Sequence, residues 1–302
     1  MNQYAKTTNS PWLSLIILLG LTLAFSFAVQ FIVVALDFLV SRHIDNLMAS
    51  EGSGALYALL IAGTLGAFLL PSLGLQYLEK NVLYFPQQRQ GNQVYFIGII
   101  FLFAFGPMMQ LLAEWNANMS LPASLEAIER WMKEQEESMA SLTKKVVMVD
   151  SIPLLLLNVV VMAALPAIAE EFYFRGSIMH IIGRMVQNNH LAIWITAIVF
   201  SAIHIQFYGF FPRVVLGAFF GYMMIWSQNI WVPVLGHFIN NVWITVMAYY
   251  YTTQGKTYED LQHYESYSII VYIGSFIFTG LIGYWFYSQT HKKENFDGER
   301  LD

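Results

Sequence analysis

Long apolar runs occupy most of this chain, and they restrict its fold more than any other feature of the sequence. A helix needs about 20 apolar residues to cross the hydrocarbon core of a bilayer. Because a spanning segment must pair its own backbone groups, repeated runs of this length indicate helices. We therefore predict an all-α fold, a polytopic membrane helix bundle with about eight transmembrane helices. The runs cover residues 12–40, 54–78, 94–114, 152–183, 191–207, 210–227, 230–251 and 267–288.

The overall composition agrees with a membrane protein and excludes several classes of site. The 302 residues are 57% hydrophobic and 12% charged, whereas about a quarter of the residues in an ordinary soluble domain are charged. The net charge of −5 and the lack of a basic block argue against a nucleic-acid partner. Since the chain has no cysteine, it has no disulfide, no thiolate metal site and no cysteine nucleophile. The lipid bilayer is the expected partner.

The distribution of Lys and Arg favours one orientation in the membrane. Eight spans put both termini on the same side, and cytoplasmic loops are enriched in Lys and Arg. If the termini are cytoplasmic, the inner segments carry Lys6, Lys80, Arg89, Arg184, Lys292, Lys293 and Arg300. The short outer loops then carry Arg42, Arg213 and Lys256. Residues 115–151 oppose this count with four further basic residues. We expect a multi-pass integral membrane protein with both termini in the cytoplasm.

The apolar pattern divides the chain into three regions. Residues 1–150 hold three spans and an insert at about 115–151, residues 151–288 hold the other spans, and residues 289–302 form a polar C-terminal tail. Apolar residues of the insert recur at spacings of three and four, which predicts an amphipathic helix. We expect this helix to lie on the membrane surface or on the bundle, and a gating or partner-binding role is the alternative.

Two adjacent carboxylates and an arginine interrupt the fourth apolar run, in the stretch AALPAIAEEFYFRGSIM at residues 163–179. Ionisable side chains inside a span rarely face lipid and mark functional sites by default. Glu171 and Arg175 are four residues apart, so they can pair on one helix face. A structural ion pair with Glu171 accounts for Arg175, but it does not account for the second carboxylate, Glu170. Two close carboxylates in an apolar site are suited to acid–base chemistry.

A histidine in the next apolar run is the expected partner of these carboxylates. The turn between the two spans is predicted at residues 187–189, and Glu170 and His204 lie equally far from Gln187 in opposite directions. In an antiparallel helical hairpin, equal distances from the turn mean equal depth. A lone histidine near a helix end is more often structural, but this spacing predicts that Glu170 and His204 share a level.

The seventh apolar run adds His237 and Asn241, which are four residues apart and share a helix face. Both side chains can donate hydrogen bonds without carrying a charge. Polar side chains in a membrane also simply hold helices together, each contributing about 1 kcal/mol. The motif alone favours neither interpretation.

Proline and glycine residues in these runs have structural interpretations. Pro166 lies one helical turn before Glu170, where it would free the carbonyl of Met162 and permit a kink. Gly217 and Gly221 form a small-xxx-small pair, which predicts close helix packing more than a functional site.

Taken together, the polar residues form three short motifs on three successive parts of the bundle. The motifs are E-E-x-x-x-R at Glu170, Glu171 and Arg175, F-x-x-x-H at Phe200 and His204, and H-x-x-x-N at His237 and Asn241. In this order they resemble the CAAX-protease and bacteriocin-processing family of intramembrane proteases (CPBP or Abi), which includes the type II CAAX prenyl endopeptidase. The resemblance covers about residues 150–250.

The resemblance implies an intramembrane peptide hydrolase in a bacterial cell membrane, acting on protein or peptide substrates that can be lipidated. It implies that Glu170 and His204 activate a water molecule for attack on a peptide carbonyl, with Glu170 as general base. His237 and Asn241 would donate hydrogen bonds to the developing oxyanion.

The second carboxylate and the arginine have a supporting role in this scheme. Glu171 and Arg175 would orient Glu170 and balance its charge. Arg175 is also a candidate receptor for a carboxylate of the substrate. We expect Phe200 to contribute packing.

A metal site is the alternative to a metal-free reaction. Glu170, His204 and His237 could act as zinc ligands, because a catalytic zinc site needs about three protein ligands and a water, and the family was long described as metalloproteases. The chain has no H-E-x-x-H motif, and the mechanism proposed for the relative uses glutamate without metal. We therefore expect no cofactor.

Two functions of other classes remain open at the level of the sequence. The buried Glu and His could relay protons in a proton-coupled transporter, although the chain lacks the internal repeat usual in such carriers. The protein could also be a non-catalytic membrane scaffold or immunity factor whose helical insert binds a partner.

Overall fold

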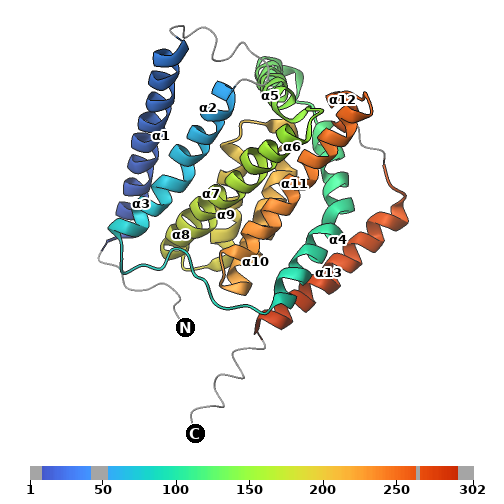
Figure 1. Ribbon diagram of the computed structural model, residues 1–302. Coiled ribbons are helices and arrows are strands. Elements are labelled where there is room, and N and C mark those ends of the chain that lie inside the picture. The colour runs from blue at the N-terminus through green and yellow to red at the C-terminus, as the bar shows by residue number, and fades with distance from the viewer. Residues whose placement is uncertain (1–8, 42–53, 263–265, 292–302) are drawn as a thin grey trace.

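The computed structural model describes residues 9–41, 54–262 and 266–291, and most of these are helical (Figure 1). Within these ranges there is no β-strand, and the backbone forms only one isolated antiparallel bridge, between Gln87 and Asn229. The predicted all-α fold is confirmed. The helices are α1 (Pro11–Ser41), α2 (Gly54–Thr64), α3 (Leu70–Leu78), α4 (Asn92–Ala117), α5 (Glu126–Val147), α6 (Ile152–Asn158), α7 (Leu165–Glu171), α8 (Met179–Val186), α9 (Asn189–Ala202), α10 (Phe210–Ser227), α11 (Trp231–Thr253), α12 (Tyr258–Gln262) and α13 (Ile269–His291).

Six helical segments of the described chain are long and apolar enough to cross a membrane. They are Pro11–Leu39, Gly54–Leu78, Asn92–Ala117, Ile152–Val186, Phe207–Ser227 and Ile269–His291. The other two expected spans are also helices: α9 is apolar but has only 14 residues, and α11 has 23 residues but carries His237, Asn240 and Asn241. The protein is an integral membrane helix bundle, as predicted.

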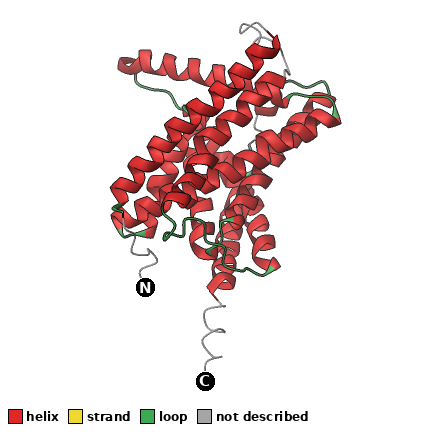
Figure 2. Cartoon of the chain, turned by 60° about the vertical axis from the view of Figure 1, so that its left-hand side comes forward, coloured by secondary structure: helices red, strands yellow, loops and turns green. Residues whose placement is uncertain are grey.

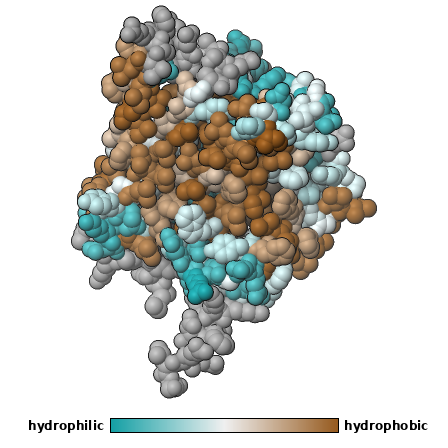
Figure 3. All heavy atoms as spheres, viewed as in Figure 1, coloured by the Kyte–Doolittle hydropathy of each residue, from teal (hydrophilic) through white to brown (hydrophobic). Residues whose placement is uncertain are grey.

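The exterior and the chain direction agree with this assignment. Figure 3 shows a broad hydrophobic area across the middle of one face, with hydrophilic residues toward both ends. The start of α1 and the end of α13 lie at the same end of the bundle in Figure 1. An even number of crossings requires this arrangement. Of the predicted polar tail, residues 289–291 belong to α13 and residues 292–302 lie outside the described residues.

The polar motif with the two glutamates lies on one long, continuous helical path from α6 to α8. Two π-helical segments interrupt this path, Val159–Ala164 before Pro166 and Phe172–Ile178 directly after Glu171. Pro166 has no N–H to donate, and the wider π turn before it accommodates the resulting break in the hydrogen-bond ladder. π turns are frequent at functional sites, and here they flank α7, which carries both glutamates.

Glycines permit the close approach of α9 and α10. A Cβ atom at Gly221 would lie 2.8 Å from Cγ2 of Ile193, and one at Gly217 would lie 3.2 Å from Cβ of Ala197. A side chain at either position would force the two helices apart, so the predicted packing role of the small-xxx-small pair is confirmed. The same close approach brings the Gly217 carbonyl into the centre of the bundle.

The predicted amphipathic insert is present as α5, which lies at the end of the bundle opposite the start of α1 (Figure 1). α5 appears nearly end-on in Figure 1, and Figure 2 shows a helix lying across that end of the bundle. The rings of Trp131 and Phe207 are 5.3 Å apart, and the Tyr208 N–H donates to Glu136 Oε2 at 3.4 Å. α5 therefore packs on the loop between α9 and α10.

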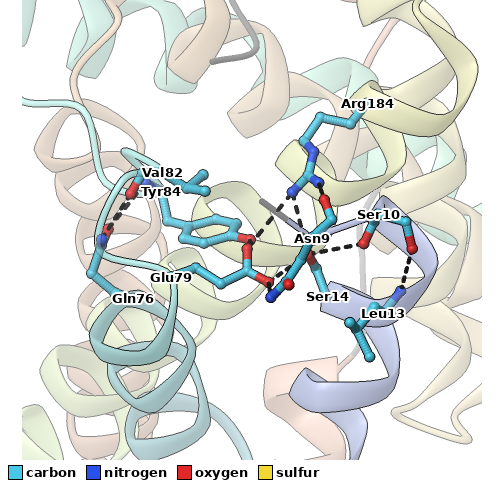
Figure 4. A network of polar contacts seen from close by, with 9 residues as sticks. All are labelled: Asn9, Ser10, Leu13, Ser14, Gln76, Glu79, Val82, Tyr84 and Arg184. Carbon is cyan, nitrogen blue, oxygen red and sulfur yellow. Dashed lines mark hydrogen bonds and ion pairs between the residues drawn. The ribbon is translucent and has the colours of Figure 1, made fainter. Parts of the chain in front are cut away.

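A buried polar cluster ties α1, α3 and α8 together at the end of the bundle where α1 begins (Figure 4). Glu79 accepts hydrogen bonds from Ser14 at 2.7 Å, from Asn9 at 3.0 Å and from the Tyr84 hydroxyl. Arg184 lies 3.8 Å from Glu79 and donates to the Asn9 carbonyl at 2.7 Å. Because each charge has several partners, this ion pair can remain buried.

We expect Glu79→Gln to remove a pH-dependent part of the stability. Burial opposes the charged form most strongly, but the hydrogen bonds to the carboxylate and the charge of Arg184 together outweigh it, and the pKa of Glu79 is lowered from 4.5. A lowered folded-state pKa stabilises the fold above the unfolded pKa, and this stabilisation is lost as the pH falls through the folded pKa.

The measurement is the thermal midpoint in detergent micelles between pH 7 and pH 3. The wild-type midpoint should fall more steeply with acidification than that of Glu79→Gln. Glu137→Gln, at an exposed position of α5, is the matched control, and its thermal midpoint should change with pH as that of the wild type does. Parallel curves for the wild type and Glu79→Gln would contradict the linkage.

Candidate active site

A fully buried ion pair between Arg175 and Glu171 lies at the centre of the site. Arg175 Nη1 donates to Glu171 Oε1 at 2.7 Å, with side chains 1% and 0% exposed respectively. The second nitrogen, Nη2, donates to the Gly217 carbonyl of α10 at 2.8 Å. The spacing of four residues predicted the ion pair, and the fold adds the contact to α10. Removing either charge would leave the other buried and uncompensated.

Aromatic rings cover both the arginine and the nearby histidine. The guanidinium carbon of Arg175 lies 4.8 Å from the ring centroid of Phe200 and 5.6 Å from that of Phe220. Cation–π contacts of this kind favour a guanidinium in a place that water does not reach. The His237 ring stacks on Phe220 with centroids 5.3 Å apart. Phe200 thus makes a cation–π contact with Arg175 in addition to its packing role.

His237 of α11 joins the two glutamates of α7. Its Nδ1 lies 2.9 Å from Glu171 Oε1, and its Nε2 lies 3.9 Å from Glu170 Oε2. Since an ionised carboxylate only accepts hydrogen bonds, Nδ1 carries the proton in the first contact. Nε2 therefore faces Glu170 either as an acceptor or, in the charged ring, as a second donor. The sequence indicated His237 as a site residue but not its bond to Glu171.

The other members of the predicted site border this group. Asn241 is half-buried one turn along α11, and its Oδ1 accepts from Asn240 Nδ2 at 3.2 Å, which leaves its own amide group to donate. Glu170 is 13% exposed, in contrast to Glu171, which is buried completely. The carboxylate next to the ion pair is therefore the more accessible of the two.

His204 lies just after α9, in the loop that leads to α10. Its Nδ1 is 2.7 Å from the Phe200 carbonyl, which can only accept, so Nδ1 carries the proton and Nε2 has a free lone pair. No hydrogen bond or ion pair joins His204 to Glu170 among the described residues, and their shared depth stays a prediction. The charge of Arg213 acts on both Glu170 and His204.

Arg213 is a residue near the site that sequence reasoning missed. The sequence counted it only among the basic residues on the outer side, at the start of the expected span 210–227, and in the structure it lies in the first turn of α10 and is half-buried. Its Nη2 donates to Gln206 Oε1 at 3.0 Å. A single basic residue at the head of an apolar span was the available signal, but a span end is also where such residues simply meet lipid headgroups.

The predicted zinc alternative does not fit these residues. Within the described part of the chain, no group of three or more His, Asp or Glu side chains has the geometry to hold a metal ion. We therefore derive no step through a metal.

Comparison with known proteins identifies the region that holds this site. Residues 152–243 match the family of type II CAAX prenyl endopeptidases described as Rce1-like. The resemblance predicted from the motifs is confirmed. The Rce1-like region includes α6 to α10 and the part of α11 that carries His237 and Asn241. Proteases of this family need no cofactor, and the match supports intramembrane protease activity of the CAAX type in general.

A bacterial relative matches part of the chain. The "Uncharacterized protein YpbD" of Bacillus subtilis (strain 168) is 26% identical over 117 residues, which cover 37% of this chain and 55% of that protein. The chain thus spans about half the length of this relative. No solved structure matches the chain.

The central ion pair gives a direct stability test. Glu171→Ala leaves Arg175 buried without a counter-ion, which typically costs about 3–5 kcal/mol. The double variant Glu171→Met/Arg175→Met removes both charges and should recover part of this loss. Unfolding in mixed detergent micelles measures the difference. If the double variant were less stable than Glu171→Ala, the uncompensated charge of Arg175 would not be the main cause of the lost stability.

Proposed function

We propose that this protein is an intramembrane endopeptidase that hydrolyses peptide bonds of membrane-associated or lipidated proteins or peptides. The observation that carries the proposal is the convergence of Glu170, Glu171 and His237 from α7 and α11 within the Rce1-like region. Ionisable groups gathered inside an apolar bundle are costly and are typical of a reaction site. In this proposal residues 151–288 form the catalytic bundle and residues 1–150 its support.

Glu170 is the proposed general base. It is the accessible carboxylate of the pair, while Glu171 is occupied by Arg175 and His237. A water molecule held by Glu170 and by the lone pair on His204 Nε2 loses its proton to Glu170 and attacks the peptide carbonyl carbon. When the tetrahedral intermediate collapses, the proton on Glu170 passes to the departing amine. The products are a carboxylate and a free N-terminus.

His237 and Asn241 are the proposed donors to the oxyanion. Asn241 has a free amide donor, and donors that are already oriented stabilise the transition state most. Because His237 Nδ1 already donates to Glu171, Nε2 can donate only if the ring carries both protons. Glu171 would stabilise that charged ring. The role of Glu171 is thus to hold both Arg175 and His237 in place.

The apolar exterior is the basis for proposing substrates that reach the site from the bilayer. Peptides with a lipid anchor or a membrane-spanning segment would meet the bundle laterally. The proposed location is a bacterial cell membrane with both chain termini in the cytoplasm, following the distribution of Lys and Arg.

We expect Glu170→Gln to abolish proteolysis while the bundle stays folded. The substitution keeps the size of the side chain and removes the proton acceptor, and loss of a general base typically costs 10²–10⁴-fold in rate. His204→Ala should show a loss of similar size. The assay is comparative peptide-end analysis of membranes containing wild-type or Glu170→Gln protein, together with the thermal midpoint of each purified protein.

Glu126→Gln is the control, because Glu126 is an exposed carboxylate of α5 that pairs with Arg130 of the same helix, away from the site. It should leave the pattern of peptide ends unchanged. Unaltered proteolysis in folded Glu170→Gln protein would falsify the proposed base. Proton-coupled flux in vesicles that is lost in Glu170→Gln would favour the transporter, and activity retained in a Glu170/His204 double variant would favour a scaffold.

A further inference from the structure

Arg175, the sequence-based candidate for binding a substrate carboxylate, is not available for that task. It is 2% exposed, and both terminal nitrogens are engaged, Nη1 by Glu171 and Nη2 by the Gly217 carbonyl. The rings of Phe200 and Phe220 lie against the guanidinium. A substrate could reach Arg175 only by breaking the centre of the bundle. A carboxylate of the substrate therefore needs another cation.

Arg213 is a cation held in position by neutral groups. Its Nη2 donates to Gln206 Oε1 at 3.0 Å and its Nη1 to the Gln206 carbonyl at 3.4 Å. Gly209 lies close to the same nitrogen, since a Cβ atom there would be 3.1 Å from Nη2. The loop between α9 and α10 thus surrounds one edge of the guanidinium. Arg213 remains half-buried rather than sealed.

The charge of Arg213 lacks a direct counter-ion. Among the described residues no carboxylate oxygen lies within 4.0 Å of its nitrogens. Glu136 and Glu170 act on it only from a longer range. A guanidinium has five N–H donors in a planar fork that matches a carboxylate. The side-chain oxygen and the backbone carbonyl of Gln206 accept from two of these donors. Arg213 is therefore a half-buried guanidinium at the head of a span, with donors left to bind an anionic group.

The location of Arg213 relates it to the proposed reaction. His204 precedes Gln206 by two residues in the same loop, and the charge of Arg213 acts on both His204 and Glu170. Ile205, between them, has a φ of 52°, which is rare for a β-branched residue and fixes an unusual turn. Because Gln206 contacts Arg213 and lies in the same loop as His204, the conformation of this loop positions both His204 and Arg213.

We propose that Arg213 is the receptor for the C-terminal carboxylate of the substrate peptide. This inference rests on the proposed endopeptidase function and adds to it how the substrate is positioned. Gln206 holds Arg213 and follows His204 by two residues, so a peptide end bound at Arg213 would lie near the loop that carries the histidine. The enzyme would then cut a fixed, short distance from the end of its substrate and release a small peptide.

The test uses two probes that differ only at the carboxyl end. Both are peptides with a farnesylated cysteine followed by three residues, one with a free C-terminal carboxylate and one with a carboxamide. Purified wild-type protein should cleave the acid with a KM about 10- to 100-fold lower than that of the amide, the range expected for a charged hydrogen-bonded pair. Arg213→Gln should raise the KM of the acid probe to that of the amide with little change in kcat.

Further variants separate recognition from a structural role. Arg213→Lys keeps the charge and should restore part of the preference for the acid, whereas Gln206→Ala loosens the loop but retains the cation and should weaken the preference less than Arg213→Gln. If Arg213 only held the loop and thus His204, Arg213→Gln would lower kcat for both probes equally. That result, or equal KM values for the two probes with the wild type, overturns the inference.

These results separate the inference from the function on which it rests. Cleavage of both probes without preference leaves the endopeptidase in place and removes only the role of Arg213. If Glu170→Gln cleaves as fast as the wild type, or the wild type cleaves neither probe, the proposed function fails for this substrate class and the inference fails with it.

Discussion

The polar centre of this membrane protein depends on one carboxylate oxygen. Glu171 Oε1 accepts hydrogen bonds from both Arg175 Nη1 and His237 Nδ1, and Arg175 continues to the Gly217 carbonyl. A single buried atom thus links α7, α10 and α11. In a medium of low dielectric constant such contacts are strong, and each partner is costly to leave alone. Because Glu171 accepts the hydrogen bonds of Arg175 and His237, these two groups do not need Glu170 as their acceptor.

Features that depend on nearby residues could be predicted from the sequence. The spacing of four residues indicated the Glu171–Arg175 pair, and the polar stretch at 187–189 indicated the turn, where Gln187 adopts a left-handed conformation. The small residues of α10 indicated close packing. In each case the geometry of one helix or one hairpin fixes which side chains can meet. The order of the three motifs then indicated the family.

Features that depend on the packing of distant segments could not be predicted. The bond from His237 to Glu171 joins residues 66 positions apart, and helical periodicity does not state which faces of two helices meet. The sequence also did not show that α9 is a helix of only 14 residues, because the polar loop that ends it still contains apolar residues such as Ile203 and Ile205.

The buried cluster around Glu79 has a consequence for how the protein is made. Its partners are Asn9, Ser14, Tyr84 and Arg184. The contact between Ser14 and Arg184 spans 170 positions of the chain. During synthesis, α1 and α3 are made before α8, so Glu79 has no contact with Arg184 until α8 has been synthesised. The polar cluster therefore gains its cation only after the segment that bears Glu170 and Glu171 has been synthesised. His237 and Asn241 of α11 follow later in the chain, so the candidate site can be completed only after this cluster.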